Sequence, residues 1–234
     1  MNELEIKMSL INYLSTEHPK ETGTKFIKEL FVENFARRAD VVMVNGHLSA
    51  YEIKSDLDSL LRLERQLDSF TRYFEYVTVV CTKTHLNKVR AILSRDEWLK
   101  VGIFLVNGKK VKSVRKPKKN VLRIDYWFSH LPVDELRKML KENAIPAKGN
   151  RAELVNAACE HLSAKLVREF VLQYFKRRDA KIQTMKKGNQ PERRLPQISL
   201  NDELIKSYQS TGVLTKTKLR VPRPVIRHRE GISR

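Results

Sequence analysis

Hydrophobic positions recur along the first part of the chain with two different spacings, and the two spacings alternate. Leu4 to Leu14 carries apolar residues three to four positions apart and predicts a helix. Tyr76 to Cys81 and Val101 to Val106 are nearly continuous apolar runs that predict buried strands, and Asn87 to Leu93 predicts a helix between them. Helices alternating with strands predict an α/β sheet with helices on both faces.

Two segments near the middle of this pattern are less regular. Thr24 to Leu30 predicts a short helical turn that leads into a strand near Leu30 to Val32. Farther on, Ser55 and Asp58 have the spacing of a capping box and predict the start of a helix. The apolar stripe of that helix would comprise Leu57, Leu60, Leu61, Leu63, Leu67, Phe70 and Phe74.

Between these segments lies a predicted hairpin, in which two apolar runs flank Asn45-Gly46. Asp40 enters the first strand, and Glu52-Ile53-Lys54 ends the second. Residues two apart in a strand share a face, so Glu52 and Lys54 point the same way. Two carboxylates at one end of a hairpin would suit a hard cation such as Mg²⁺, and an ammonium beside them could stabilise charge on a phosphate. The alternative is an ordinary solvated strand face.

The turn decides whether Asp40 can join the other two side chains. A two-residue turn at Asn45-Gly46 pairs Val44 with His47 and turns Asp40 away from Glu52. The site therefore requires a three-residue loop or a β-bulge.

Asp40, the Glu52-Ile53-Lys54 triplet and the helix after it resemble the core of the PD-(D/E)XK nuclease superfamily, in particular a small family found in bacteria and phages. The resemblance implies a restriction-endonuclease-like mixed sheet flanked by helices. It implies metal binding by Asp40 and Glu52, with Mg²⁺ or Mn²⁺ as the cofactor, and a catalytic role for Lys54. A further acid, Glu29 or as a fallback Glu33, would assist at the metal.

The predicted helix after the hairpin carries two polar residues that bear on the resemblance to the nucleases, Gln66 and Arg62. Gln66 matches a glutamine that lies beside the metal and substrate in the resembling enzymes, although Phe70 stands where they carry tyrosine. Arg62, one turn earlier, is a candidate DNA contact. Both could instead belong to a solvated helix face.

Net charge narrows the choice of partners. The 234 residues carry a formal charge of +19, which suits a polyanion, because each phosphate contact releases counterions. We expect DNA as the partner, with RNA as an alternative, and no membrane. The chain has two cysteines, and they lack metal-ligand spacing. The N-terminus lacks a signal-peptide pattern. Both observations predict a cytoplasmic location.

The second half of the chain departs from the sheet pattern. We expect residues 1–108 to form the nuclease-like domain and residues 109–128 to form a basic hairpin tip or linker, in which Lys116, Lys118 and Lys119 would contact DNA. Residues 129–178 predict a helix, an extended link and a second helix. This layout resembles the SAP motif, a small DNA-binding module. The matching residues are Leu136, Leu140, Ile145-Pro146, Gly149, Ala152 and Leu154-Val155.

The SAP resemblance implies that Lys148, Asn150 and Arg151 face phosphates at the start of the second helix. An ordinary helical hairpin packed on the first domain is the alternative. Residues 179–234 predict a basic, largely flexible tail with one short helix near Leu200 to Tyr208.

Two functions follow from these observations. The first is a Mg²⁺-dependent nuclease that hydrolyses DNA phosphodiester bonds at Asp40, Glu52 and Lys54. The alternative is a non-catalytic DNA-binding or regulatory protein built on a nuclease-like fold and encoded by a phage; an RNA-associated basic protein is a weaker third hypothesis.

Overall fold

The structure is a computed structural model that describes residues 1–18, 23–33 and 36–185. Its strands are β1 (Lys25–Val32), β2 (Arg37–Val44), β3 (Leu48–Lys54), β4 (Tyr76–Cys81), β5 (Gly102–Asn107) and β6 (Lys110–Arg115). Its helices are α1 (Glu3–Glu17), α2 (Leu63–Tyr73), α3 (Lys83–Ile92), the 3-10 helix η2 (Asp96–Trp98), α4 (Ile124–Phe128), α5 (Val133–Glu142), α6 (Arg151–His161) and α7 (Ala164–Met185).

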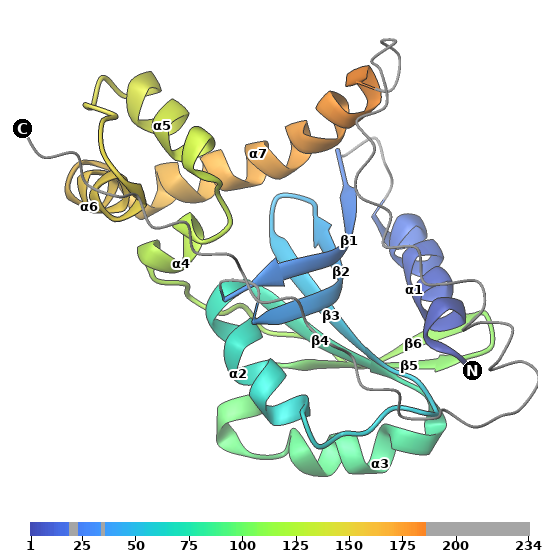
Figure 1. Cartoon of the computed structure of the whole chain (residues 1–234). Helices are drawn as coiled ribbons and strands as arrows, with labels where there is room; N and C mark the ends of the chain where they lie inside the picture. The colour runs from blue at the N-terminus through green and yellow to red at the C-terminus, as the bar shows by residue number, and fades with distance from the viewer. Residues whose placement is uncertain (19–22, 34–35, 186–234) are drawn as a thin grey trace, which may run out of the picture. The chain divides into compact units, whose positions relative to one another are not determined.

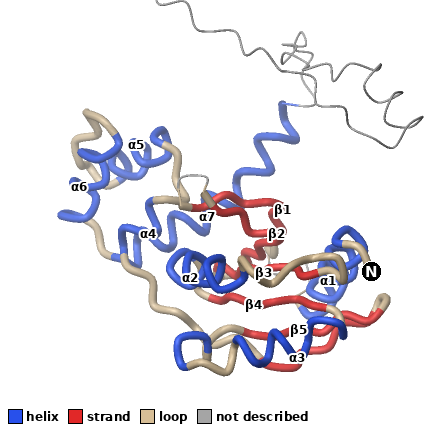
Figure 2. The backbone as a smooth tube through the Cα atoms, turned by 60° about the horizontal axis from the view of Figure 1, so that its bottom comes forward, coloured by secondary structure: helices blue, strands red, loops and turns tan. Residues whose placement is uncertain are grey.

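The strands form one mixed sheet in sequence order, β1-β2-β3-β4-β5-β6 (Figure 1). The pairs β1–β2 and β2–β3 are antiparallel, the pairs β3–β4 and β4–β5 are parallel, and β6 returns antiparallel to β5. The two parallel connections each contain a helix, α2 and α3, because parallel strands need a long crossover. Figure 2 shows the strands side by side between these helices and α1.

Each face of the sheet has its own hydrophobic core. Ile6, Leu10 and Leu14 of α1 pack against one face, where they cover alternate residues of the central strands: Val41, Met43, Tyr51, Ile53, Val80, Phe104 and Val106. Helices α2 to α7 contribute to the core on the opposite face. The predicted α/β sheet with helices on both faces is confirmed; the assignment to the restriction-endonuclease-like class stays a prediction.

The predicted helix after the hairpin begins later than its apolar stripe suggested. α2 starts at Leu63, and Leu57 and Leu61 are 91% and 87% exposed. The carboxylate of Asp58 accepts hydrogen bonds from the backbone N–H and the hydroxyl of Ser55, at 2.7 and 2.6 Å. The two residues thus bond as predicted, but they close an isolated turn, because such local bonds compete with helix formation.

Two other segments also differ from the sequence predictions. The helical turn expected at Thr24 to Leu30 is instead most of β1, because pairing with β2 overrides local propensity. Within the predicted linker 109–128, residues 110–115 form the edge strand β6. Its partly buried Val111 and Val114 pack into the cores on opposite faces of the sheet, and the surrounding charge run obscured these two apolar positions.

The C-terminal helices are not a separate body. α5, α6 and α7 share one hydrophobic cluster with α2 and the sheet, and the described residues belong to a single compact unit. α7 continues to Met185, beyond the predicted end of the module at 178. The predicted helix near Leu200 to Tyr208, and the tail after 185, lie outside the described residues.

Glu75 joins three distant parts of this unit. Its side chain is almost fully buried, yet it accepts hydrogen bonds from Arg168 on α7 at 2.9 and 3.1 Å, from the Leu48 amide at 3.1 Å, and from Lys119 at 3.1 Å. Arg168 also donates to the Gly46 carbonyl at the hairpin tip, at 2.6 Å. Burial alone would raise the pKa of Glu75, but these donors outweigh it and hold the pKa below its usual value.

Candidate functional site

The hairpin turn has the odd parity that the site requires. Val44 pairs with Leu48, which leaves a three-residue loop of Asn45, Gly46 and His47. Gly46 has a φ of +92°, a left-handed conformation that glycine adopts without strain. Continued by one position, this register sets Asp40 opposite Glu52. Of the two alternatives that the site required, a three-residue loop or a β-bulge, the loop is present.

Glu52, Lys54 and Gln66 form a buried hydrogen-bonded cluster. Tyr51 and Ile53 pack toward α1, so Glu52 and Lys54 point to the opposite face, where α2 presents Gln66. Lys54 Nζ donates to Glu52 Oε1 at 2.8 Å and to Gln66 Oε1 at 2.9 Å. Gln66 Nε2 donates to the same oxygen of Glu52. Glu52 Oε2 is buried without a hydrogen-bond partner in the structure.

Asp40 lies beside this cluster and raises its proton affinity. Burial, and then the charge of Asp40, raise the pKa of Glu52 to about 7, although Lys54 and Gln66 act in the other direction. Burial also raises the pKa of Asp40, opposed by the Ile53 N–H that donates to Asp40 Oδ2 at 2.7 Å. Two carboxylates that disfavour each other's ionisation are a feature of functional sites and also of buried ion-pair networks.

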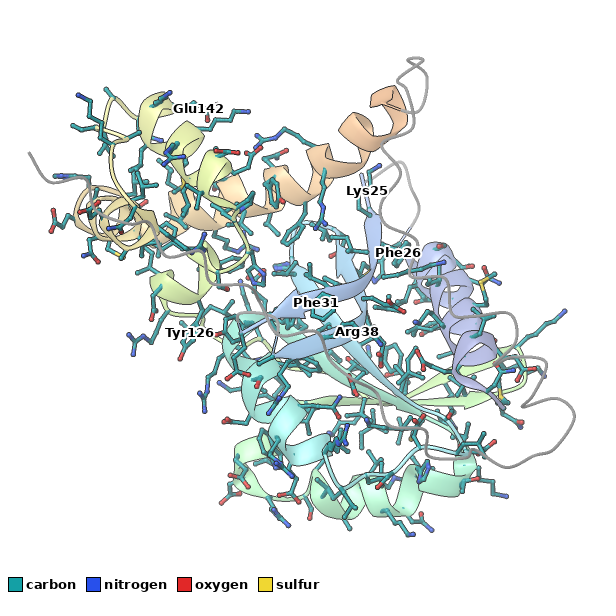
Figure 3. All side chains as sticks on the ribbon, in the orientation of Figure 1. Lys25, Phe26, Phe31, Arg38, Tyr126 and Glu142 are labelled. Carbon is teal, nitrogen blue, oxygen red and sulfur yellow. The ribbon has the colours of Figure 1, made fainter. Side chains whose placement is uncertain are left out.

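A cavity of about 380 Å³ opens next to the cluster and is rich in arginine. It is lined by Ala36, Arg37, Arg38, Asp40, Arg62, Arg65 and Gln66, and we call it the arginine cleft. Arg38 packs on Phe31 of β1, with 5.9 Å between the guanidinium carbon and the ring centre (Figure 3). The cleft brings Arg62 and Gln66 together, as the sequence predicted. Arg37 and Arg38 lie just before Asp40 in the sequence, but the sequence did not indicate that they line one cavity together with Arg65.

Helix α1 adds charged residues that the sequence analysis missed. Lys7 is buried, and its ammonium lies 3.1 Å from Glu3 and 3.7 Å from Glu29. Glu3 and Lys7 both act electrostatically on Asp40. The four-residue spacing of Glu3 and Lys7 was the available signal, but helix periodicity could not show that α1 lies against this end of the sheet.

The two further acids that the resemblance offered have other partners. Glu29 pairs with Lys7 and with Arg38, at 3.3 Å from the latter, and its φ of +58° marks an irregularity in β1. Glu33 accepts a hydrogen bond from Ser69 on α2 at 2.7 Å. Over residues 1–18, 23–33 and 36–185, no three His, Cys, Asp or Glu side chains are grouped to hold a metal. Metal binding by Asp40 and Glu52, with or without Glu29, stays a prediction.

The predicted DNA contacts of the SAP-like segment are largely occupied within the protein. Asn150 caps α6 by accepting from the amides of Ala152 and Glu153. Arg151 donates to the carbonyls of Leu131 and Phe128, both at 2.8 Å. Lys148 is exposed, as are Lys116 and Lys118 before α4; Lys119 pairs with Glu75. The SAP assignment stays a prediction.

Sequence comparison places these features in a family. A family model described as bacteriophage P4 protein cII matches residues 1–198, which include the hairpin, the cluster and the arginine cleft. The chain belongs to the bacteriophage P4 protein cII family. Protein cII of Enterobacteria phage P4 is 34% identical over 184 residues, spanning 76% of this chain and 68% of that protein. The expected connection to phages is confirmed.

Structural comparison adds little to this cII-family assignment. A protein of unknown function from Silicibacter pomeroyi aligns with a TM-score of 0.34 and 16% identity, covering 46% of this chain and 68% of the other. A likeness this distant supports no argument about function. Separately, among the described helices, none combines the length and apolarity that crossing a membrane requires.

Proposed function

We propose that this cII-family protein is a phage-encoded, non-catalytic nucleic-acid-binding protein with a regulatory role. The observation that carries the proposal is the arginine cleft, in which four guanidinium groups line one cavity. Guanidinium groups bind phosphate through paired N–H donors, and the chain's net charge of +19 would attract a polyanion over a longer range.

Two of these four arginines have no acidic partner among the described residues, so their charge can act on a phosphate. Within the described residues, neither Arg62 nor Arg65 forms an ion pair, and both are exposed. Arg38 shares its charge with Glu29, and Arg37 donates to the Ala36 carbonyl. Arg62 and Arg65 are therefore the first choice for phosphate contacts.

The neighbouring cluster supports a non-catalytic role because it is internally neutralised. Lys54 supplies Glu52 with a cation at 2.8 Å, and both side chains are nearly inaccessible to water. The buried ammonium of Lys54 compensates the charge of the Glu52 carboxylate without a metal.

Replacing Arg62 and Arg65 with alanine tests the proposal. Each lost phosphate contact should reduce the slope of log affinity against log salt by about 0.9 for duplex DNA. Arg90→Ala is the matched control, because Arg90 is an exposed arginine on α3 outside the cleft. Equal salt slopes for the double variant and the wild type would remove the cleft from DNA binding.

A metal-dependent nuclease is the second candidate, and one observation favours it. Among the residues that the structure describes, Glu52 Oε2 is a buried oxygen without a hydrogen-bond partner, and it lies beside Asp40. Mg²⁺ accepts one or two carboxylates with water in its remaining positions. The two acids thus fit a hard cation, which would polarise a phosphate for attack by water. Asp40 and Glu52 would hold it, and Lys54 and Gln66 would orient Glu52.

The two candidates respond oppositely to the same substitutions. Asp40→Asn and Glu52→Gln remove negative charge beside the cleft, so a binder should hold DNA equally or more tightly. A nuclease should lose cleavage while it retains binding, and Lys54→Ala should slow turnover by about 10²-fold. Linear, circular and single-stranded DNA with Mg²⁺, Mn²⁺ or EDTA provide the assay. Metal-dependent cleavage by the wild type that these variants abolish would establish the nuclease.

A further inference from the structure

The segment between β3 and α2 exposes two leucine side chains to solvent. Leu57 is 91% exposed and Leu61 is 87% exposed. A single exposed leucine is common in proteins, but two from one short segment beside a cationic cavity point to a ligand with both apolar and anionic parts.

Leu57 projects from one ordered turn, and Leu61 from a second turn in which the Leu63 amide donates to the Leu60 carbonyl at 3.0 Å. Ser55 and Asp58 close the first turn with side-chain bonds and with a backbone bond of 3.2 Å from the Asp58 amide to the Ser55 carbonyl. Asp56, between them, accepts a hydrogen bond from Thr84 at 2.8 Å. The segment is therefore fixed at several points, and little ordering entropy remains to be lost when a ligand contacts the leucines.

Leu61 adjoins the arginine cleft, and Leu57 lies four residues before Leu61 on the same segment. Leu61 directly precedes Arg62, which lines the cleft. Leu61 and Arg65 also line a second cavity, of about 710 Å³, between this segment and α3. Arg65 thus borders both cavities, and a chain of phosphates held in the cleft would bring its bases to this segment.

The second cavity also contains a polar group without a partner. His85 of α3 lines it, and neither buried ring nitrogen makes a hydrogen bond within the described residues. The cavity combines this imidazole with the apolar side chains of Leu60, Leu61 and Ile92. An apolar wall next to a polar side chain suits the face and edge of a nucleobase.

We infer that Leu57 and Leu61 contact unpaired DNA bases while the arginine cleft holds the adjoining phosphates. The inference rests on the proposed nucleic-acid binding and adds its substrate class, DNA with unpaired bases. In a duplex the flat faces of the bases are stacked on one another, whereas in a single strand they are free for apolar contact.

The test uses the full chain, a single-stranded oligonucleotide containing 2-aminopurine, and a duplex of the same sequence. Leu57→Ser with Leu61→Ser should weaken single-strand binding by about tenfold or more, since two apolar contacts are lost, and should change duplex binding little. The 2-aminopurine fluorescence change seen with the wild type should shrink in parallel. Val121→Ser is the matched control, because Val121 is equally exposed, at 91%, and lines neither cavity.

The outcomes separate this inference from the proposed function. If the leucine variant binds both DNAs as the wild type does, while the Arg62 and Arg65 variant binds both more weakly, the inference fails and phosphate binding stands. Equal weakening on single strand and duplex also overturns it. If the wild type binds neither DNA, both proposals fail together. Thermal unfolding of each variant confirms that it is folded.

Discussion

Asp40 Oδ2 accepts a hydrogen bond of 2.7 Å from the backbone N–H of Ile53, the residue that separates Glu52 from Lys54. This bond ties the start of the hairpin to its end. A slip of one residue would move Asp40 to another amide and turn Glu52 and Lys54 to the face covered by α1. Strand register and the electrostatics of the cluster are therefore fixed together.

Glu52 should make the protein less stable as the pH rises. Its pKa in the folded protein is about 7, against an ordinary value of 4.5, so between these values the folded state holds a proton that the unfolded state has lost. The free energy of unfolding should fall by on the order of 2–3 kcal/mol across this window, and Glu52→Gln should remove the decrease. Urea unfolding of both proteins at pH 5 and pH 8 measures the difference. Parallel pH profiles would contradict the raised pKa.

His130 should act in the opposite direction at lower pH. Burial lowers its pKa to about 4, despite a hydrogen bond to the Tyr73 carbonyl at 2.9 Å. Below pH 6.5 the histidine is protonated in the unfolded state but stays neutral in the folded state. The free energy of unfolding should therefore drop by about 3 kcal/mol as the pH falls from 6.5 to 4. His130→Phe should lack this loss. The exposed His161 provides the control, because His161→Phe should retain it.

Breaking the Glu75 network should be much more costly than breaking a surface ion pair. Arg168→Ala leaves a buried carboxylate without its principal donor and should lower the free energy of unfolding by about 3–5 kcal/mol. Arg72→Ala removes an ion pair with Asp68 in which both side chains are about half exposed, and should cost less than about 1 kcal/mol. Similar melting temperatures for the two variants would show that Glu75 finds another partner.

Arg151 separates the structural role seen here from the phosphate contact expected of a SAP module. Because it donates to two carbonyls at the end of α4 and after it, Arg151→Ala should cost about 1–3 kcal/mol of stability. DNA affinity and its salt slope, measured well below the melting temperature, should stay at the wild-type level. Lys148→Ala is the companion variant, exposed and three residues away. A clear loss of DNA affinity in Arg151→Ala alone would favour the SAP assignment.

Local signals predicted the parts of the fold that depend on local physics. The apolar run at Tyr76 to Cys81 coincides with β4. The parity argument required a three-residue loop or a bulge to set Asp40 opposite Glu52, and the loop is present. Both features require only periodicity and one turn. Gln66 was singled out by the nuclease resemblance, and it lies on α2, the next element after the hairpin strand.

Features formed between distant segments could not be predicted in this way. Leu57 and Leu61 fitted a helical stripe, and only the side-chain bonds of Ser55 and Asp58 reveal why the helix starts later. Lys7 reaches the site because α1 crosses the sheet, and Glu75 depends on Arg168, 93 positions farther along the chain. Spacing along a sequence contains no information on such encounters.

The Glu75 network also sets an order of events during synthesis. The six strands are complete once residue 115 has been made, but Arg168 follows more than fifty residues later. Until then the nascent sheet must either leave Glu75 in water or bury it with one lysine and one amide as partners. Domains fold as they leave the ribosome, so we expect the sheet of this protein to stay open at the Glu75 end until α7 emerges. A chain cut before α7 would therefore report on incomplete folding rather than on the loss of a DNA-binding module.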